Sequence, residues 1–456
     1  MHWENEQVLV IGSGASGLCS TRLLLDEGAK VILYDGNKEI QEETIRAKLK
    51  NAMNVQIILG DFPESILTEI TLVVVSPGVP LDIPILCKIK ECDIPIWGEI
   101  ELAYICGKGE ILAITGTNGK TTTTTLLGEI MKAYCAETYV VGNIGNPYTA
   151  AARQTTSESV IVAELSSFQL ETIHAFHPKV SAILNLAPDH LDRHYTMEAY
   201  IKAKANIKSN QTKEDVCILN DDDRQVKALA KDTKANVWFF SASHAVERGM
   251  YLQNGKLIYQ NETTEILCDV KELKLLGIHN YENVMAASLM ALAFGVSIEI
   301  VRGVVKEFEG VAHRIEYVGE YDGVKYYNDS KGTNPDAAIK AIQAMERPTF
   351  LIAGGYDKQA DYKEWIQAFN GKVRKLLLLG NTRETIATQA KALGFEDIVL
   401  VETLEEAVHF CKGHAGEGEA VLLSPACASW GMFQNYEERG DVFKQMVRKG
   451  GVRKNE

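Results

Sequence analysis

The chain has 456 residues, which is too long for a single hydrophobic core, so we expect two to four domains. Its hydrophobic fraction of 46% and its charged fraction of 24% are those of an ordinary globular protein, which argues against long disordered stretches. The net charge of −14 disfavours a nucleic-acid partner, which would require a basic surface, but it leaves anionic small ligands open.

The cysteines and the apolar segments argue against further classes of protein. None of the 9 cysteines forms a CxxC pair, so we expect reduced, mostly buried thiols rather than a zinc site or a disulfide framework. Residues 1–6 lack the basic start of a signal peptide, and no apolar run reaches membrane-spanning length. We therefore expect a cytoplasmic protein.

The first block of the chain alternates strands and helices around a glycine motif. Strands are predicted at 8–11, 31–34 and 72–75, with a helix that runs through residue 25. Residues 12–17 have the GxGxxG spacing that lets a diphosphate approach backbone N–H groups, and Asp35 could accept hydrogen bonds from a ribose or a base. A dinucleotide and a nucleotide sugar both offer the diphosphate, and a tight turn without a ligand is the remaining alternative.

The second block starts near residue 98 and contains a second glycine motif. The predicted strand at 111–114 leads into TGTNGKTT at 115–122, and a helix begins near Thr121. In such a loop backbone N–H groups surround phosphates, Lys120 neutralises their charge, and Thr121 is placed to bind Mg²⁺. The strict pattern requires glycine where this chain has Ile114, so the loop is a shortened variant. Further strands are predicted at 160–162, 180–184 and 216–219.

The third block starts near residue 311, with strands predicted at 349–353, 375–379, 398–401 and 420–423. Across all three blocks, short β-branched runs alternate with amphipathic stretches, a pattern typical of mostly parallel sheets. We expect three α/β domains, at 1–98, 99–310 and 311–456. The first is predicted to be Rossmann-like, the second a parallel-sheet ATPase domain of P-loop type, and the third Rossmann-like again.

The loop at 115–121 resembles that of the Mur ligases, a family of three-domain, ATP-dependent enzymes of peptidoglycan precursor synthesis. Further segments that resemble family motifs are VGNIGNP at 141–147, ELSSFQL at 164–170, NLAPDHLDRH at 185–194, YIKAK at 200–204, GIHNYEN at 277–283 and HRIE at 313–316. The segment DSKGTN at 329–334 is similar to the form found in members that add D-glutamate, rather than L-alanine or a diamino acid.

The resemblance implies ATP and Mg²⁺ as cofactors, with two metal sites. We also expect a monomer, and charge and hydropathy argue against nucleic-acid and membrane partners. The resemblance implies UDP-N-acetylmuramoyl-L-alanine and D-glutamate as substrates. It also places ATP between the second and third domains, so we expect catalysis to require the third domain to close.

The resemblance assigns roles to individual residues. The ATP-binding residues would be Gly116, Thr117, Asn118, Gly119, Lys120, Thr121, Thr122, Asn283, Arg314, Asp329 and Lys331. The metal ligands would be Thr121, Glu164, His190 and Lys204, the last of them as a carbamate. The UDP-substrate would contact Ser16, Asp35, Gly78 and Asn143, and D-glutamate would contact Thr333, Lys358, Ser429 and Tyr436. The catalytic residues would be Lys120, His190, Lys204 and Arg314.

The chain departs from the family pattern near the expected amino-acid pocket. Gly431 and Met432 stand where the family usually has Asp and Gln, and Tyr436 stands where it has Phe. These departures bear on the geometry of the pocket and leave the expected reaction unchanged. The main alternative is another Mur ligase with a different amino-acid acceptor. The remaining alternatives are an NAD-dependent oxidoreductase, a P-loop ATPase or switch protein, a nucleotide-sugar sensor and a folylpolyglutamate synthase.

Overall fold

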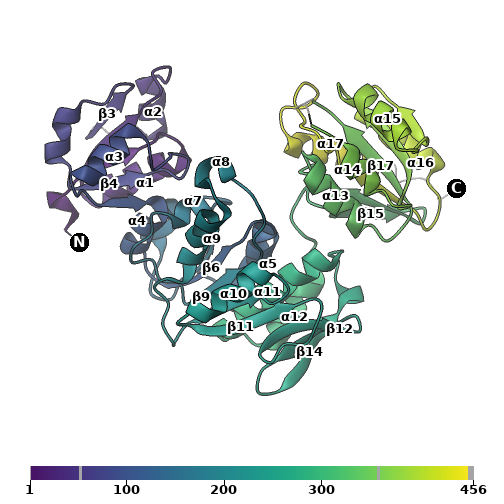
Figure 1. Ribbon diagram of the computed structural model, residues 1–456, viewed down its shortest axis with the longest axis horizontal. Helices are drawn as coiled ribbons and strands as arrows, with labels where there is room; N and C mark the ends of the chain where they lie inside the picture. Colours follow the sequence, from purple (N-terminus) through teal and green to yellow (C-terminus); the bar gives the residue numbers. More distant parts are fainter. Residues whose placement is uncertain (1, 51–53, 357–359, 450–456) are drawn as a thin grey trace. The chain divides into compact units, whose positions relative to one another are not determined.

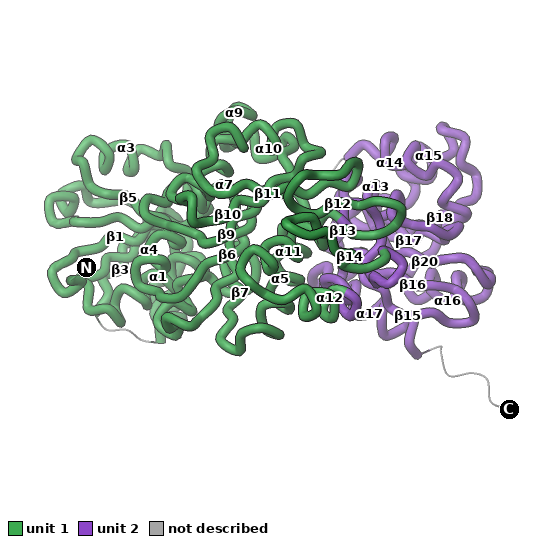
Figure 2. Tube along the Cα trace, turned by 90° about the horizontal axis from the view of Figure 1, so that it is seen from below, with its two compact units in different colours: residues 1–269, 282–305 green, residues 270–281, 306–456 purple. Residues whose placement is uncertain are grey.

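The computed structural model describes residues 2–50, 54–356 and 360–449. It divides into two compact units, with residues 1–269 and 282–305 in unit 1 and residues 270–281 and 306–456 in unit 2 (Figure 2). Among the described residues, no helix is both long and apolar enough to span a bilayer.

The first sheet of unit 1 is parallel, with the strand order β3-β2-β1-β4-β5. Figure 1 labels β3 and β4 of this sheet and the helices α1 to α4 around it. Its strands are β1 (Gln7–Ile11), β2 (Lys30–Asp35), β3 (Val55–Leu59), β4 (Leu72–Val75) and β5 (Ile96–Gly98). Its helices are α1 (Ala15–Asp26), α2 (Glu42–Lys48), α3 (Pro84–Glu91) and α4 (Glu99–Cys106). Val8 and Val10 belong to one buried cluster, and Leu9 and Ile11 belong to another. Because both faces of β1 are covered, its sequence is an uninterrupted apolar run.

The second sheet of unit 1 has the order β14-β13-β12-β11-β10-β9-β6-β8-β7. Its strands are β6 (Glu110–Thr115), β7 (Thr138–Gly142), β8 (Val160–Glu164), β9 (Val180–Ile183), β10 (Val216–Asn220), β11 (Asn236–Ser241), β12 (Gly249–Gln253), β13 (Lys256–Gln260) and β14 (Thr264–Asp269). Its helices are α5 (Lys120–Tyr134), α6 (Tyr148–Ala151), α7 (Ser167–Leu170), α8 (Leu191–His194), α9 (Met197–Ala205), α10 (Arg224–Ala228), α11 (Ile278–Phe294) and α12 (Ile298–Glu307). One buried cluster contains side chains of both sheets, such as Val10 and Ala113, so the two sheets of unit 1 share a core.

The sheet of unit 2 has the order β15-β16-β20-β17-β18-β19. Its strands are β15 (Glu316–Tyr321), β16 (Val324–Asn328), β17 (Thr349–Gly354), β18 (Val373–Leu379), β19 (Ile398–Leu400) and β20 (Ala420–Leu423). Its helices are α13 (Pro335–Ala344), α14 (Lys363–Gln367), α15 (Arg383–Ala392), α16 (Leu404–His414) and α17 (Tyr436–Lys449). Leu351 and Leu422 pack on one face and Phe350 and Val421 on the other.

All the strands predicted from the sequence are present, and the mixed α/β fold class is confirmed. Three hairpins, β12–β13, β13–β14 and β15–β16, add antiparallel strands that the predicted parallel pattern did not include. Two of them turn at dipeptides with positive φ angles: Asn254 (51°) and Gly255 (74°) join β12 to β13, and Asp322 (51°) and Gly323 (75°) join β15 to β16. Asn-Gly and Asp-Gly are the strongest two-residue hairpin signals, so the sequence did carry this information. The domain boundaries stay a prediction.

Candidate active site

Of the residues expected at the UDP-substrate, Ser16, Asp35 and Gly78 lie at the carboxyl edge of the first sheet, whereas Asn143 follows β7 in the second sheet. Gly12, directly after β1, has a φ of +99°, and a Cβ there would meet Ser76 Oγ at 2.8 Å. The middle glycine of the motif, Gly14, has no atom within 4 Å of the position of a Cβ, so its backbone faces open space. Ser16 lies in the first turn of α1, and Gly78 is exposed after β4. The edge therefore leaves room for a ligand against the turn.

Asp35 holds this turn from the end of β2. Its Oδ2 accepts hydrogen bonds from Ser13 N at 2.8 Å and Ser13 Oγ at 2.6 Å. Partial burial favours the neutral acid, but the hydrogen bonds from Ser13 and Asn37 outweigh burial and hold the pKa of Asp35 below its usual value. Asp35 is therefore a carboxylate at neutral pH, and it orders the glycine turn.

The loop at 115–121, which we call the phosphate loop after its predicted role, follows β6 at the carboxyl edge of the second sheet. Gly119 precedes α5 with a φ of +83°, and a Cβ there would meet Asn283 Oδ1 at 2.2 Å. Lys120 Nζ donates to Gly116 O at 2.8 Å and to Thr117 O at 2.9 Å. Thr121 and Thr122 lie in the first turn of α5, where helix amides and the helix dipole favour an anion.

Lys204, on α9, reaches the same loop from the other side. Its side chain is buried, with 2% of its surface exposed, and its Nζ donates to Gly116 O at 2.8 Å. Burial, together with the nearby charge of Lys120, lowers the pKa of Lys204 to about 7. A large share of Lys204 side chains is therefore neutral at physiological pH, the form in which an amine is a nucleophile.

Glu164, at the end of β8, offers an unused carboxylate oxygen. Its Oε1 accepts a hydrogen bond from Asn143 Nδ2 at 2.8 Å, while Oε2 is buried and has no hydrogen-bond partner among the described residues. A buried charged oxygen without a partner is costly, so the arrangement fits a cation at Oε2. Asn143, which was expected at the UDP-substrate, thus also holds Glu164 in place.

The segment after β9 carries His190, which the structure places on an exposed turn with a φ of 52°. Its ring packs against Phe168, with the ring centroids 4.9 Å apart, and its Nε2 lies 3.5 Å from Asp189 Oδ2. No three His, Cys, Asp or Glu side chains in the described ranges form a metal-binding group. The expected ligand set includes only Glu164 and His190 of these types, with Thr121 and Lys204 completing it.

Asn283, on α11, lies against the start of α5. It is buried, and its Oδ1 accepts a hydrogen bond from Thr123 Oγ1 at 3.2 Å. Asn283 and Gly119 are therefore packed so closely that the loop tolerates only glycine at position 119.

In unit 2, two of the expected nucleotide residues, Asp329 and Lys331, follow β16, and Arg314 lies just before β15. Asp329 is buried: its Oδ2 accepts from Ser424 Oγ at 2.7 Å and its Oδ1 from Ile315 N at 3.2 Å. Burial raises the pKa of Asp329 to about 7, although Ser424 and the charge of Arg314 oppose this shift. Asp329 thus holds the backbone next to Arg314.

The residues expected at D-glutamate lie around the same edge. Ser429 is buried after β20, Thr333 is half-buried, and Tyr436 begins α17. Lys331 Nζ lies 5.7 Å from the centre of the Tyr436 ring. Lys358 lies outside the described residues.

The sequence did not single out Arg439, although it organises this edge. Its side chain is 2% exposed, and it donates to Ser330 Oγ at 2.9 Å, to Ser330 O at 2.8 Å and to Cys427 O at 3.2 Å. Its neighbours Glu437, Glu438 and Asp441 suggest a solvated helix, so the sequence gives no sign that this arginine is buried.

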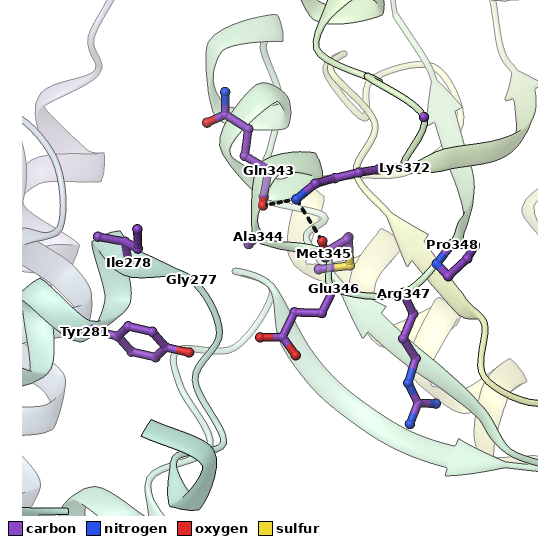
Figure 3. Close-up of a pocket in the computed structure, with 11 residues that line it drawn as sticks. Gly277, Ile278, Tyr281, Gln343, Ala344, Met345, Glu346, Arg347, Pro348 and Lys372 are labelled. Atoms are coloured by element: carbon purple, nitrogen blue, oxygen red, sulfur yellow. Dashed lines mark hydrogen bonds between the residues drawn. The ribbon is translucent and has the colours of Figure 1, made fainter. Parts of the chain in front are cut away.

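A cavity of about 610 Å³ lies in unit 2, at the opposite, amino edge of the sheet (Figure 3). It is lined by Tyr281, Met345, Pro348 and Lys372, among others. Lys372 Nζ donates to Gln343 O at 2.6 Å and to Met345 O at 2.9 Å, which satisfies carbonyls at the end of α13. None of the residues predicted for the site lines this cavity.

Three family models match the chain in sequence. Residues 6–98 match the Mur ligase MurD-like N-terminal domain, residues 114–291 the Mur ligase middle domain, and residues 313–427 the Mur ligase glutamate ligase domain.

Curated relatives match nearly the whole length of the chain. The chain is 56% identical to the UDP-N-acetylmuramoylalanine–D-glutamate ligase of Lachnoclostridium phytofermentans, over 98% of this chain and 99% of the relative. It is 51% identical, with the same coverage, to the enzyme of that name from Lachnospira eligens. Among solved structures, the UDP-N-acetylmuramate-alanine ligase MurC of Thermotoga maritima has the same fold, with a TM-score of 0.58 and 19% identity over 98% of this chain and 99% of that one. The chain belongs to the Mur ligase family.

Proposed function

We propose that this chain is an ATP-dependent ligase that adds D-glutamate to UDP-N-acetylmuramoyl-L-alanine in peptidoglycan synthesis. The substrate pair rests on the relatives that share about half of its residues over their full length. The chemistry rests on one structural observation: the phosphate loop, the unpartnered oxygen of Glu164 and the buried amine of Lys204 meet at one edge of one sheet.

The proposed reaction has two steps. A carboxylate oxygen of the UDP-substrate attacks the γ-phosphorus of ATP, the bond from that phosphorus to the β-γ bridging oxygen breaks, and ADP leaves. The amine nitrogen of D-glutamate then attacks the acyl carbon, the bond to the phosphate oxygen breaks, and inorganic phosphate and a proton leave. The protein mainly neutralises and positions the phosphoryl group, a task for Lys120 and Arg314, with Lys331 as a further phosphate contact.

Magnesium would neutralise phosphate charge when bound, at two sites. Thr121 and Glu164 offer oxygen ligands of the kind Mg²⁺ prefers, and His190 would serve the second site. Within the chain, Asn143 fixes Oε1 of Glu164 so that Oε2 stays available.

Lys204 would support the second site as a carbamate. A neutral lysine amine adds carbon dioxide and releases a proton, which converts a cation into an anion. The lowered pKa of about 7 supplies the neutral amine that this addition requires. Without the modification, the amine of Lys204 stays on Gly116 O and offers no negative ligand.

The two ends of the substrate complex would lie in different parts of the fold. Asp35, Ser16 and Gly78 would contact the UDP-sugar, and Thr333, Ser429 and Tyr436 would contact D-glutamate, with Lys358 as a further candidate. We also propose a monomer located in the cytoplasm.

Phosphate release from ATP and Mg²⁺ in the presence of UDP-N-acetylmuramoyl-L-alanine tests the proposal, with D-glutamate, L-glutamate, L-alanine and L-lysine as acceptors. We expect release with D-glutamate alone, together with the matching amide product. Release with another acceptor would leave a Mur ligase of different specificity. Release without any acceptor would favour a plain ATPase, and ATP-independent binding of the UDP ligand would favour a sensor.

A further inference from the structure

The side chain of Asn185 forms a pair of hydrogen bonds with the backbone of Asn118 in the phosphate loop. Asn185 Oδ1 accepts from Asn118 N at 2.8 Å, and Asn185 Nδ2 donates to Asn118 O at 3.0 Å. The amide side chain thus occupies both the donor and the acceptor of one loop residue, as a neighbouring strand would.

This pair continues the ladder between β6 and β9. Leu184 N donates to Thr115 O at 3.0 Å, and Thr117 N donates to Asn185 O at 2.9 Å. Two residues after Asn185, Ala187 N donates to Thr117 Oγ1 at 3.0 Å. The first half of the loop is therefore fastened, residue by residue, to the segment that follows β9.

These hydrogen bonds limit which backbone amides of the loop can bind a phosphate. The N–H groups of Thr117 and Asn118 point to Asn185, so in this arrangement they are not directed at a phosphate. The amides left to bind an anion are those from Gly119 into the first turn of α5. Because a helix start binds anions only where its amides converge, the position of the loop decides how well they do so.

We propose that Asn185 is a positioning residue for the phosphate loop, which holds Asn118 so that Gly119 and the start of α5 can receive the phosphates of ATP. The segment after Asn185 also carries His190, so the same contact connects the loop to that histidine along the chain. This proposal rests on the proposed function for the identity of the nucleotide.

Two substitutions separate the parts of the contact. Asn185→Asp keeps the acceptor at Oδ1 but removes the donor to Asn118 O, and Asn185→Leu removes both at similar size. A hydrogen bond contributes about 0.5–1.5 kcal/mol, so we expect ATP to bind about 2- to 10-fold more weakly to Asn185→Asp and about 5- to 100-fold more weakly to Asn185→Leu. Calorimetric titration of the full chain with ATP and Mg²⁺ measures this without turnover. Steady-state kinetics should show a raised KM for ATP and an unchanged KM for D-glutamate.

Asn210→Leu is the matched control. Asn210 is also half-buried in unit 1, and its Nδ2 donates to His174 O at 2.7 Å and to Phe176 O at 2.9 Å, outside the loop. We expect it to lower the melting temperature as Asn185→Leu does but to leave ATP affinity unchanged. Wild-type ATP affinity in Asn185→Leu, or an equal loss in Asn210→Leu, would overturn the proposal. Wild-type protein that binds ATP but releases no phosphate would instead count against the proposed function alone.

Discussion

At the scale of single residues, the phosphate loop depends on Lys120. Its ammonium lies on the carbonyls of Gly116 and Thr117, directly beside the start of α5. We expect Lys120→Ala to lower kcat by about two orders of magnitude or more, since removing one transition-state contact has this effect in other enzymes. Phosphate release measures it. Lys132→Ala, an exposed lysine of the same helix that pairs with Glu129, is the control and should keep full activity. Near wild-type turnover in Lys120→Ala would contradict the proposed phosphate-binding role of the loop.

The buried amine of Lys204 makes stability depend on pH. Its pKa is about 7 in the folded protein and about 10.4 in an unfolded chain, so between these values the unfolded state binds more protons. The free energy of unfolding should therefore rise with pH in this window. In carbon dioxide-free buffer, we expect the wild type to gain stability relative to Lys204→Met between about pH 7 and 9 in urea unfolding. Parallel stability curves would show that the amine titrates normally.

The carbamate proposed at Lys204 has a separate test. Lys204→Ala should lose most activity, because the second cation site loses its negative ligand, and it should recover part of it with added short carboxylic acids. Lys202→Ala, an exposed lysine of the same helix, should need no rescue. Full activity of Lys204→Ala without any added acid would exclude the carbamate.

At the scale of elements, α5 packs on β7 through a glycine. A Cβ at Gly128 would meet Val140 Cγ2 at 2.6 Å, and the branched valine side chain has little freedom to move away. Overpacking costs about 1–3 kcal/mol, while alanine gains about 1 kcal/mol over glycine inside a helix. We therefore expect Gly128→Ala to destabilise the wild-type protein by about 1 kcal/mol. The same substitution should stabilise the Val140→Ala variant by about 1 kcal/mol. Urea unfolding of the four proteins measures the coupling, and additive effects would contradict the packing argument.

At the scale of the whole molecule, the predicted ATP residues are divided between the two units. Lys120 belongs to unit 1, and Arg314, Asp329 and Lys331 belong to unit 2. Because all of them are expected to serve one nucleotide, the units should close when ligands bind. Small-angle scattering should show a smaller radius of gyration with a non-hydrolysable ATP analogue and the UDP-substrate than without them. An unchanged radius would count against closure.

Much of this protein follows from the sequence by itself. Strand, glycine loop and helix are local signals, because glycine permits the turn and the apolar run marks the strand, so both glycine turns could be placed without a structure. Parallel strands end at a common edge of the sheet, so residues that follow neighbouring strands lie close together, as Glu164 and the loop at 116–120 do. Two of the three antiparallel hairpins also have a local signal, Asn254-Gly255 and Asp322-Gly323, although the alternating βα pattern predicts only parallel strands.

Only the tertiary structure decided which side chains hold the site together. Asn185 lies 67 residues from Asn118, Lys204 lies 88 from Gly116, and Arg439 lies 109 from Ser330. No local pattern specifies such pairs, because a hydrogen bond between distant segments depends on how the whole sheet and its helices pack. The same packing removes Lys204 from water and lowers its pKa, and it leaves one oxygen of Glu164 buried without a partner. The residue types come from the sequence, but burial and partners, which set their chemistry, come from the fold.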